Sequence, residues 1–359
     1  MNEAVMSKKR TRIVGLDLYR LLSVFLIFLF HSNIHIQCNY GVLNQFVNSG
    51  AIYMTAFFIL SGFSLYLVWQ RKDLHNIVEL RKFYLKRLIS ILPLYYSVAL
   101  VYICFLGQES TVQNLLIAPV EILGIQSIFN SLFGVTHNGG TWFVSCILMC
   151  YLVYPLIQEI IKQLTSKLKV TIILIAVFIL LYSPLIVHFF KTSGIYSNPF
   201  FRIMEFLIGT IICSLIPSIQ GSKLSKIIFS WWVILIEHAV LIICITEAVK
   251  HNIAVGNYML YSWVALPMFM VIIISMYGAK SPRNMMNSKI VNYLCEISYA
   301  FFLCQFFSWK TTMFIISKIG MDNNLLRIVI SFMVCMGYAI LLHEVLEKPI
   351  SNYLKKKLL

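Results

Sequence analysis

Hydrophobic residues occur along this chain in long runs, each bounded by charged or turn-forming residues. A helix needs about 20 predominantly apolar residues to cross the ~30 Å hydrocarbon core of a bilayer. The runs predict ten membrane-spanning helices, at 13–33, 50–70, 88–107, 141–161, 170–190, 199–217, 230–249, 258–277, 291–316 and 325–345. The sequence therefore predicts an all-α polytopic membrane protein with short connections.

The longest connection, residues 108–140, contains several glycines and a short apolar stretch that we expect to lie against the membrane. No segment has the length and composition of a separate soluble domain. We therefore expect a basic N-terminal segment at 1–12, one membrane domain at 13–347 and a basic tail at 348–359.

The positions of the basic residues predict the orientation of the helices. Most of the 29 lysines and arginines fall on one predicted side of the membrane, in clusters at 8–12, 71–87, 162–169, 223–226, 280–289 and 348–357. Cytoplasmic loops carry such an excess, so both termini are expected in the cytoplasm, and the even number of spans agrees with their lying on the same side. The first span has the charge order of a signal peptide, but no small-residue cleavage site follows it, and we interpret it as a retained helix.

Composition supports the membrane assignment and excludes other classes. Of the 359 residues, 59% are hydrophobic and only 12% charged, whereas soluble domains are about 45–50% apolar. The net charge of +15 does not predict a nucleic-acid partner, because the cations are divided among loops between apolar runs. Membrane lipid is the expected surrounding. The nine cysteines are odd in number and lie mostly in spans, and Cys146 and Cys150 lack further ligands nearby, so neither a disulfide framework nor a metal site is expected.

The first predicted helix contains the most informative polar residues. Asp17, Arg20 and His31 lie in an apolar span, where ionisable groups are costly and often functional. Eleven residues at 100° each bring Arg20 and His31 to the same helix face, about 16 Å apart along the axis. This spacing suits a groove in which Arg20 fixes an anion at one end and His31 transfers a proton deeper in the membrane. Alternatively, Arg20 extends to the lipid interface and His31 only bonds a neighbouring helix.

Other candidates lie near the ends of later spans. Ser61 and Gly62 allow close packing of the second helix, and Lys86 and Arg87 belong to a basic, aromatic segment that could attract anionic lipid or surround a phosphate-bearing donor. Trp142, which His137 and Asn138 precede, could be an interfacial aromatic residue or part of a rim that stacks on a sugar. Arg202 and Glu205, three residues apart, are expected to form a structural ion pair.

Taken in order, these segments resemble the acyltransferase 3 family of integral membrane acyltransferases. The resemblance covers almost the whole chain. It rests on Arg20 and His31, Phe57 to Phe63, Lys86-Arg87 with Pro93 to Tyr95, Thr141-Trp142-Phe143, Arg202 to Phe206 with Gly209, Ile297-Ser298-Tyr299, and Glu347-Lys348-Pro349.

The resemblance implies acyl transfer from cytoplasmic acyl-CoA, usually acetyl-CoA, to a hydroxyl group of a cell-surface glycan, at a bacterial cell membrane. His31 matches the family's essential histidine and Arg20 its arginine partner, with Asp17 beside them. Arg87, Lys86 and Ser61 are the expected donor-binding residues, and Trp142, His137 and Asn138 the expected acceptor-binding residues. Acyl-CoA would be a substrate, and no tightly bound cofactor is expected.

Two positions depart from the family pattern. The second arginine of an Arg-x-x-Arg motif is replaced by Ser90, and a histidine that commonly follows Ile-Ser-Tyr is replaced by Gln305. The alternative function is a transporter or flippase of a glycan or lipid-linked intermediate, which would more typically show broken helices or an internal duplication. The sequence shows neither.

Overall fold

The fold is entirely helical over the residues that the computed structural model describes, which are 13–105, 111–129, 132, 140–190, 195–223, 225–251, 262–279, 289–320 and 323–359. The longer helices are α1 (Val14–Ile36), α3 (Tyr53–Trp69), α4 (Ile77–Phe105), α5 (Thr111–Leu123), α6 (Thr141–Gln163), α7 (Ser166–Phe190), α8 (Pro199–Gln220), α10 (Trp231–Lys250), α11 (Ser262–Gly278), α13 (Lys289–Ile319), α14 (Asn324–Leu342) and α15 (Lys348–Leu358). Shorter turns are η1 (Gly41–Leu43), α2 (Asn44–Asn48), η2 (Gly50–Ile52), η3 (Gln126–Ile128), α9 (Ser225–Ile228) and the π-turn η5 (His343–Glu347).

Nine helices within the described ranges are long and apolar enough to cross a membrane, and the structure confirms an all-α polytopic protein. The predicted span at 258–277 corresponds to α11, which is a shorter apolar helix. The apolar stretch expected in the long connection forms α5. Which side of the membrane each terminus faces stays a prediction.

The third predicted span begins earlier than its apolar run suggests. We placed its start at residue 88, whereas α4 begins at Ile77 and includes the basic segment. The side-chain oxygen of Asn76 accepts hydrogen bonds from the backbone N–H groups of Val78 and Glu79, at 2.9 and 3.4 Å. An asparagine that satisfies these otherwise unpaired donors starts a helix regardless of hydropathy, which is why the apolar run alone missed this boundary.

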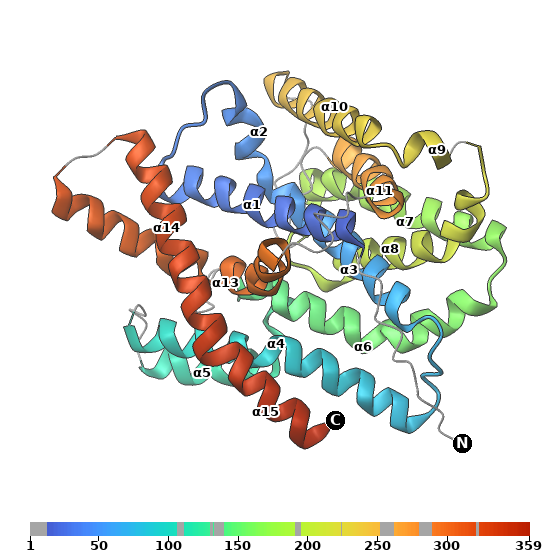
Figure 1. Cartoon of the computed structure of the whole chain (residues 1–359), viewed down its shortest axis with the longest axis horizontal. Coiled ribbons are helices and arrows are strands. Elements are labelled where there is room, and N and C mark those ends of the chain that lie inside the picture. The colour runs from blue at the N-terminus through green and yellow to red at the C-terminus, as the bar shows by residue number, and fades with distance from the viewer. Residues whose placement is uncertain are drawn as a thin grey trace.

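The helices surround a central group, as Figure 1 shows. α1, α3 and α13 lie in the middle, α14 and α15 lie at one flank, and α7, α8, α10 and α11 lie at the other. We call the side on which α1, α4 and α13 begin, and α3 and α6 end, the basic side, because the predicted basic clusters belong to it. Large apolar side chains such as Trp232, Phe178 and Leu152 remain 77%, 59% and 60% exposed, as expected for surfaces that face lipid.

α3 and α8 approach each other closely, and two glycines make the approach possible. A Cβ atom at Gly62 would lie 1.9 Å from the carbonyl oxygen of Phe206, and one at Gly209 would lie 1.9 Å from that of Ile59. Small residues at a helix interface let backbones approach closely, which is the main source of packing energy between helices in lipid. The pair fixes α3, which supplies Ser61, relative to α8.

Candidate functional site

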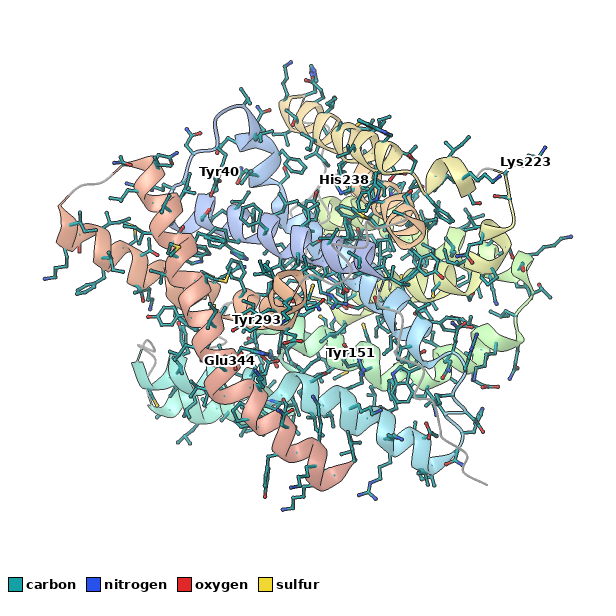
Figure 2. The ribbon with its side chains drawn as sticks, in the orientation of Figure 1. Tyr40, Tyr151, Lys223, His238, Tyr293 and Glu344 are labelled. Carbon is teal, nitrogen blue, oxygen red and sulfur yellow. The ribbon has the colours of Figure 1, made fainter. Side chains whose placement is uncertain are left out.

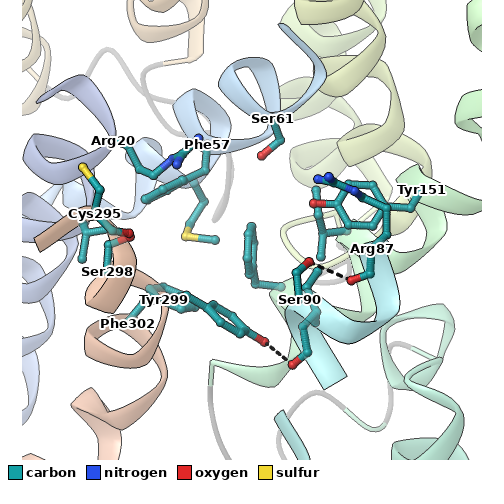
Figure 3. Close-up of a pocket in the computed structure, with 15 residues that line it drawn as sticks. Arg20, Phe57, Ser61, Arg87, Ser90, Tyr151, Cys295, Ser298, Tyr299 and Phe302 are labelled. Carbon is teal, nitrogen blue, oxygen red and sulfur yellow. Dashed lines mark hydrogen bonds between the residues drawn. The ribbon is translucent and has the colours of Figure 1, made fainter. Parts of the chain in front are cut away.

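A cavity of about 350 Å³ lies among α1, α3, α4, α6 and α13 (Figure 3). In Figure 2 the side chain of Tyr151, one of its lining residues, lies inside the bundle, whereas Lys223 projects from its edge. The polar lining of the cavity consists of two arginines and several hydroxyl groups, with no carboxylate among the lining residues that the structure describes. These polar residues are Arg20, Ser61, Arg87, Ser90, Tyr151, Ser298 and Tyr299.

The two arginines come from different helices and approach the cavity at the basic side. Arg20 of α1 lies 3.9 Å from the Asp17 carboxylate, and its side chain is 37% exposed. Arg87 of α4 lies over the Tyr151 ring at 5.8 Å, and its buried Nε has no hydrogen-bond partner within the described chain. Guanidinium groups in a cavity whose described lining residues include no carboxylate favour an anionic ligand, and their planar geometry suits phosphate oxygens.

A proline explains how α4 is held beside the cavity. Pro93 has no N–H, so the carbonyl of Ile89, four residues earlier, loses its helical hydrogen bond. The Ser351 hydroxyl of α15 donates to that carbonyl at 3.1 Å. On the cavity side, the Tyr299 hydroxyl of α13 donates to the carbonyl of Ile91 at 3.3 Å, as Figure 3 shows. Side chains from two other helices therefore fix the part of α4 that follows Arg87.

His31 lies on α1 beyond the cavity, and it is not among the residues that line it. Its imidazole stacks on that of His35, with ring centres 5.5 Å apart, and packs edge-on against Phe30 at 5.1 Å. His35 in turn stacks on Trp309 of α13 at 6.5 Å. The structure thus places Arg20 in the cavity and His31 in a separate aromatic environment, farther along the same helix.

The expected donor-binding residues divide into two groups. Ser61 and Arg87 line the cavity, whereas Lys86 lies outside it with its Nζ 5.6 Å from the ring centre of Trp69. Of this adjacent pair on α4, only Arg87 lines the cavity. His137 and Asn138, expected to bind the acceptor, lie outside the described residues.

Arg202 and Glu205 form a fully buried ion pair on α8. The Arg202 Nη1 lies 2.8 Å from one oxygen of Glu205 and 3.0 Å from the other, and both side chains are 0% exposed. Thr55 of α3 donates to Glu205 at 2.8 Å, and Arg202 donates to the carbonyl of Tyr196 at 2.7 and 2.9 Å. Burial raises the pKa of the Tyr196 phenol to about 12, although the nearby guanidinium opposes the shift. The cluster joins α8 to α3 and to the turn before α8.

Trp142, which the resemblance assigns to acceptor binding, is buried in this structure. The residue is only 5% exposed, its ring lies 4.5 Å from that of Tyr196, and the Arg202 guanidinium lies 5.2 Å from its centre. Phe58 packs nearby at 6.4 Å. Because protein groups already cover this ring, a sugar finds no free face there, and Trp142 belongs to the buried cluster around the ion pair.

Several cavity residues were not singled out in the sequence. Ser298 and Tyr299 belong to a motif on which the family resemblance rests, but nothing in their pattern indicated that they face Arg87. Tyr151 lies in an apolar run where any aromatic residue is ordinary, and Thr55 completes the buried ion pair from a distant helix. Only the tertiary structure connects these residues with their partners.

Comparison with known families gives one match. The acyltransferase domain of the acyltransferase 3 family matches residues 13–344, which is nearly the whole chain. No curated protein and no solved structure matches it. The matched range includes every helix that lines the cavity.

Proposed function

This chain belongs to the acyltransferase 3 family of membrane acyltransferases, and from that premise we propose that it transfers an acyl group, in the first instance acetyl, from acyl-CoA to a hydroxyl group of a cell-surface polysaccharide or related glycan. The proposal includes a bacterial cell membrane as its location and the cytoplasm as the compartment on the basic side. That orientation would bring the cavity mouth to the compartment in which acyl-CoA is made.

The observation that carries the proposal is the pair of arginines in one cavity, where no carboxylate occurs among the lining residues of the described chain. Coenzyme A carries its negative charges on phosphates at one end and its acyl group at the other. Arg20 and Arg87 would hold the phosphates at the basic side, because permanently charged guanidinium groups make strong hydrogen bonds to phosphate. The pantetheine arm would then lie among Ser61, Ser298 and Tyr299, whose hydroxyl groups can bond its amides.

The chemical step needs a base for the acceptor hydroxyl. As the acceptor oxygen attacks the thioester carbonyl carbon, His31 accepts the hydroxyl proton, the carbon–sulfur bond breaks, and the departing CoA thiolate takes up a proton. In the other order, a nitrogen of His31 attacks first, forms acyl-histidine with release of CoA, and then passes the acyl group to the acceptor oxygen. Asp17, 3.9 Å from Arg20, would orient the guanidinium in either case.

Incubating the purified protein with radiolabelled acetyl-CoA and glycan from the same cells tests the proposal. Label should appear in the glycan with wild-type protein and be absent with His31→Ala. Trapping the reaction without acceptor and searching tryptic peptides for acetyl-histidine distinguishes the two orders. A transporter would move glycan across vesicles without incorporating label, and that result would overturn the assignment.

A further inference from the structure

The cavity described above stops before it reaches the proposed catalytic histidine. On α1 the cavity is lined by Arg20 and Val24, but not by His31. The seven residues from Val24 to His31 correspond to about 10 Å along the helix axis. Among the residues that the structure describes, the lining of the donor-side cavity therefore ends short of His31.

Three phenylalanines from three helices lie at this end of the cavity, which Met54 near the start of α3 also lines. Phe57 of α3, Phe143 of α6 and Phe302 of α13 all line it. Their ring centres lie 6.1 Å apart for Phe57 and Phe143, 6.4 Å for Phe57 and Phe302, and 5.4 Å for Phe143 and Phe302. We call these three residues the aromatic septum. Figure 3 shows two of its members, Phe57 and Phe302, on separate helices.

Two contacts between α1 and α13 locate the septum along the bundle. Cys295 contacts the carbonyl of Asp17, with the sulfur 3.9 Å from the oxygen, and Trp309 stacks on His35. Phe302 lies midway between Cys295 and Trp309 on α13. The two helices run in the same direction, so the midpoint between Asp17 and His35 on α1 lies at the level of Phe302. That midpoint falls between Val24 and His31. The septum is thus at the level where the cavity ends.

We propose that the aromatic septum closes the donor cavity against His31 and limits the length of the acyl chain that the cavity accepts. This inference rests on the proposed function, because the arginines at the basic side direct the acyl end of CoA toward the septum. A short acyl group ends against the three rings, whereas a longer chain needs the volume that one ring fills. Because protein interiors are close-packed, a methylene group for which the cavity has no space lowers the affinity for the acyl-CoA. Rotation of the rings is then the step that admits the thioester to His31.

The experiment compares acyl-CoA thioesters of increasing length on wild-type protein, Phe302→Ala and Phe301→Ala. Phe301 is the matched control, because it neighbours Phe302 but packs against Phe28 and Phe332 and does not line the cavity. Binding of CoA and of its acetyl, butyryl, hexanoyl and octanoyl thioesters is measured by ligand-dependent thermal stabilisation in detergent. Phe302→Leu, which removes less volume, serves in the same assay if the alanine variant fails to fold.

We expect wild-type protein and Phe301→Ala to bind acetyl-CoA in strong preference to octanoyl-CoA. Phe302→Ala should bind octanoyl-CoA about tenfold more tightly than wild-type protein does, with little change for CoA itself. Unchanged chain-length preference in a folded Phe302 variant, or the same change in Phe301→Ala, would overturn the septum proposal while CoA binding still supports the proposed function. Absence of CoA binding to wild-type protein would contradict both.

Discussion

Replacing Gly62 by alanine should force α3 and α8 apart. The added Cβ would lie 1.9 Å from the carbonyl oxygen of Phe206, whereas real Cβ atoms essentially never come closer than 3.0 Å. The neighbouring atom is backbone, so α3 and α8 must move apart by about 1 Å. A side chain cannot relieve this contact by changing its rotamer.

The displacement has two energetic consequences. Overpacking of this kind costs about 1–3 kcal/mol. The same movement stretches the bond from Thr55 to Glu205, now 2.8 Å, beyond hydrogen-bonding distance, and a hydrogen bond to a charged group is worth about 1.5–3 kcal/mol. Together these terms predict a loss of about 2.5–6 kcal/mol, a large fraction of the stability of a typical protein.

The assay is thermal unfolding in detergent, followed by tryptophan fluorescence and by the loss of the monodisperse gel-filtration peak. Gly337→Ala is the matched control, because a Cβ there meets no atom within 4 Å. Alanine is the better helix former by about 1 kcal/mol, so the control should be neutral or slightly stabilised. If Gly62→Ala unfolds at the same temperature as Gly337→Ala, the close contact between α3 and α8 does not support the fold as described.

Three further predictions concern the site and the buried ion pair. His31→Ala should abolish acyl transfer while the protein remains folded in detergent, and retained label incorporation would refute its role. Arg87→Ala should raise the acyl-CoA concentration needed for half-maximal transfer by about 10- to 100-fold, because phosphate contacts are lost. Lys86 lies over Trp69 outside the cavity, so Lys86→Ala should have a smaller effect. Equal effects of the two substitutions would contradict the cavity assignment. Glu205→Gln leaves the Arg202 charge uncompensated and should destabilise the protein by about 3–5 kcal/mol in thermal unfolding. Glu344→Gln, which breaks the exposed pair with Lys348, is the control and should destabilise it much less.

Fold class could be predicted from the chain because the physical requirement is local. A spanning helix satisfies its own backbone hydrogen bonds, so length and hydropathy of each run suffice to identify it. One helix boundary differs from the prediction for an equally local reason. The start of α4 differs from the prediction because a side-chain cap, rather than an apolar residue, begins that helix.

The candidate site could be predicted only in part. Arg20 was identifiable because a charge within an apolar run is costly, and Arg87 because it belongs to a basic cluster. Their common cavity, and the exclusion of Lys86 from it, depend on the rotation of α4, which hydropathy does not specify. The sequence allowed Trp142 to be an interfacial aromatic residue or part of a sugar-binding rim, and its burial against Arg202 and Tyr196 could be seen only in the tertiary structure.

From the amino-acid sequence alone one can infer that this protein is an all-α bundle in a membrane and that its first helix carries an arginine and a histidine on one face. Periodicity and hydropathy suffice for both, since each is a property of a single helix. The packing of the helices is needed to show that Arg20 shares a cavity with Arg87. It is also needed to show that phenylalanines of α3, α6 and α13 meet where the lining of that cavity ends short of His31. Those relations depend on how side chains from helices distant in sequence pack together, and no single run of residues contains that information.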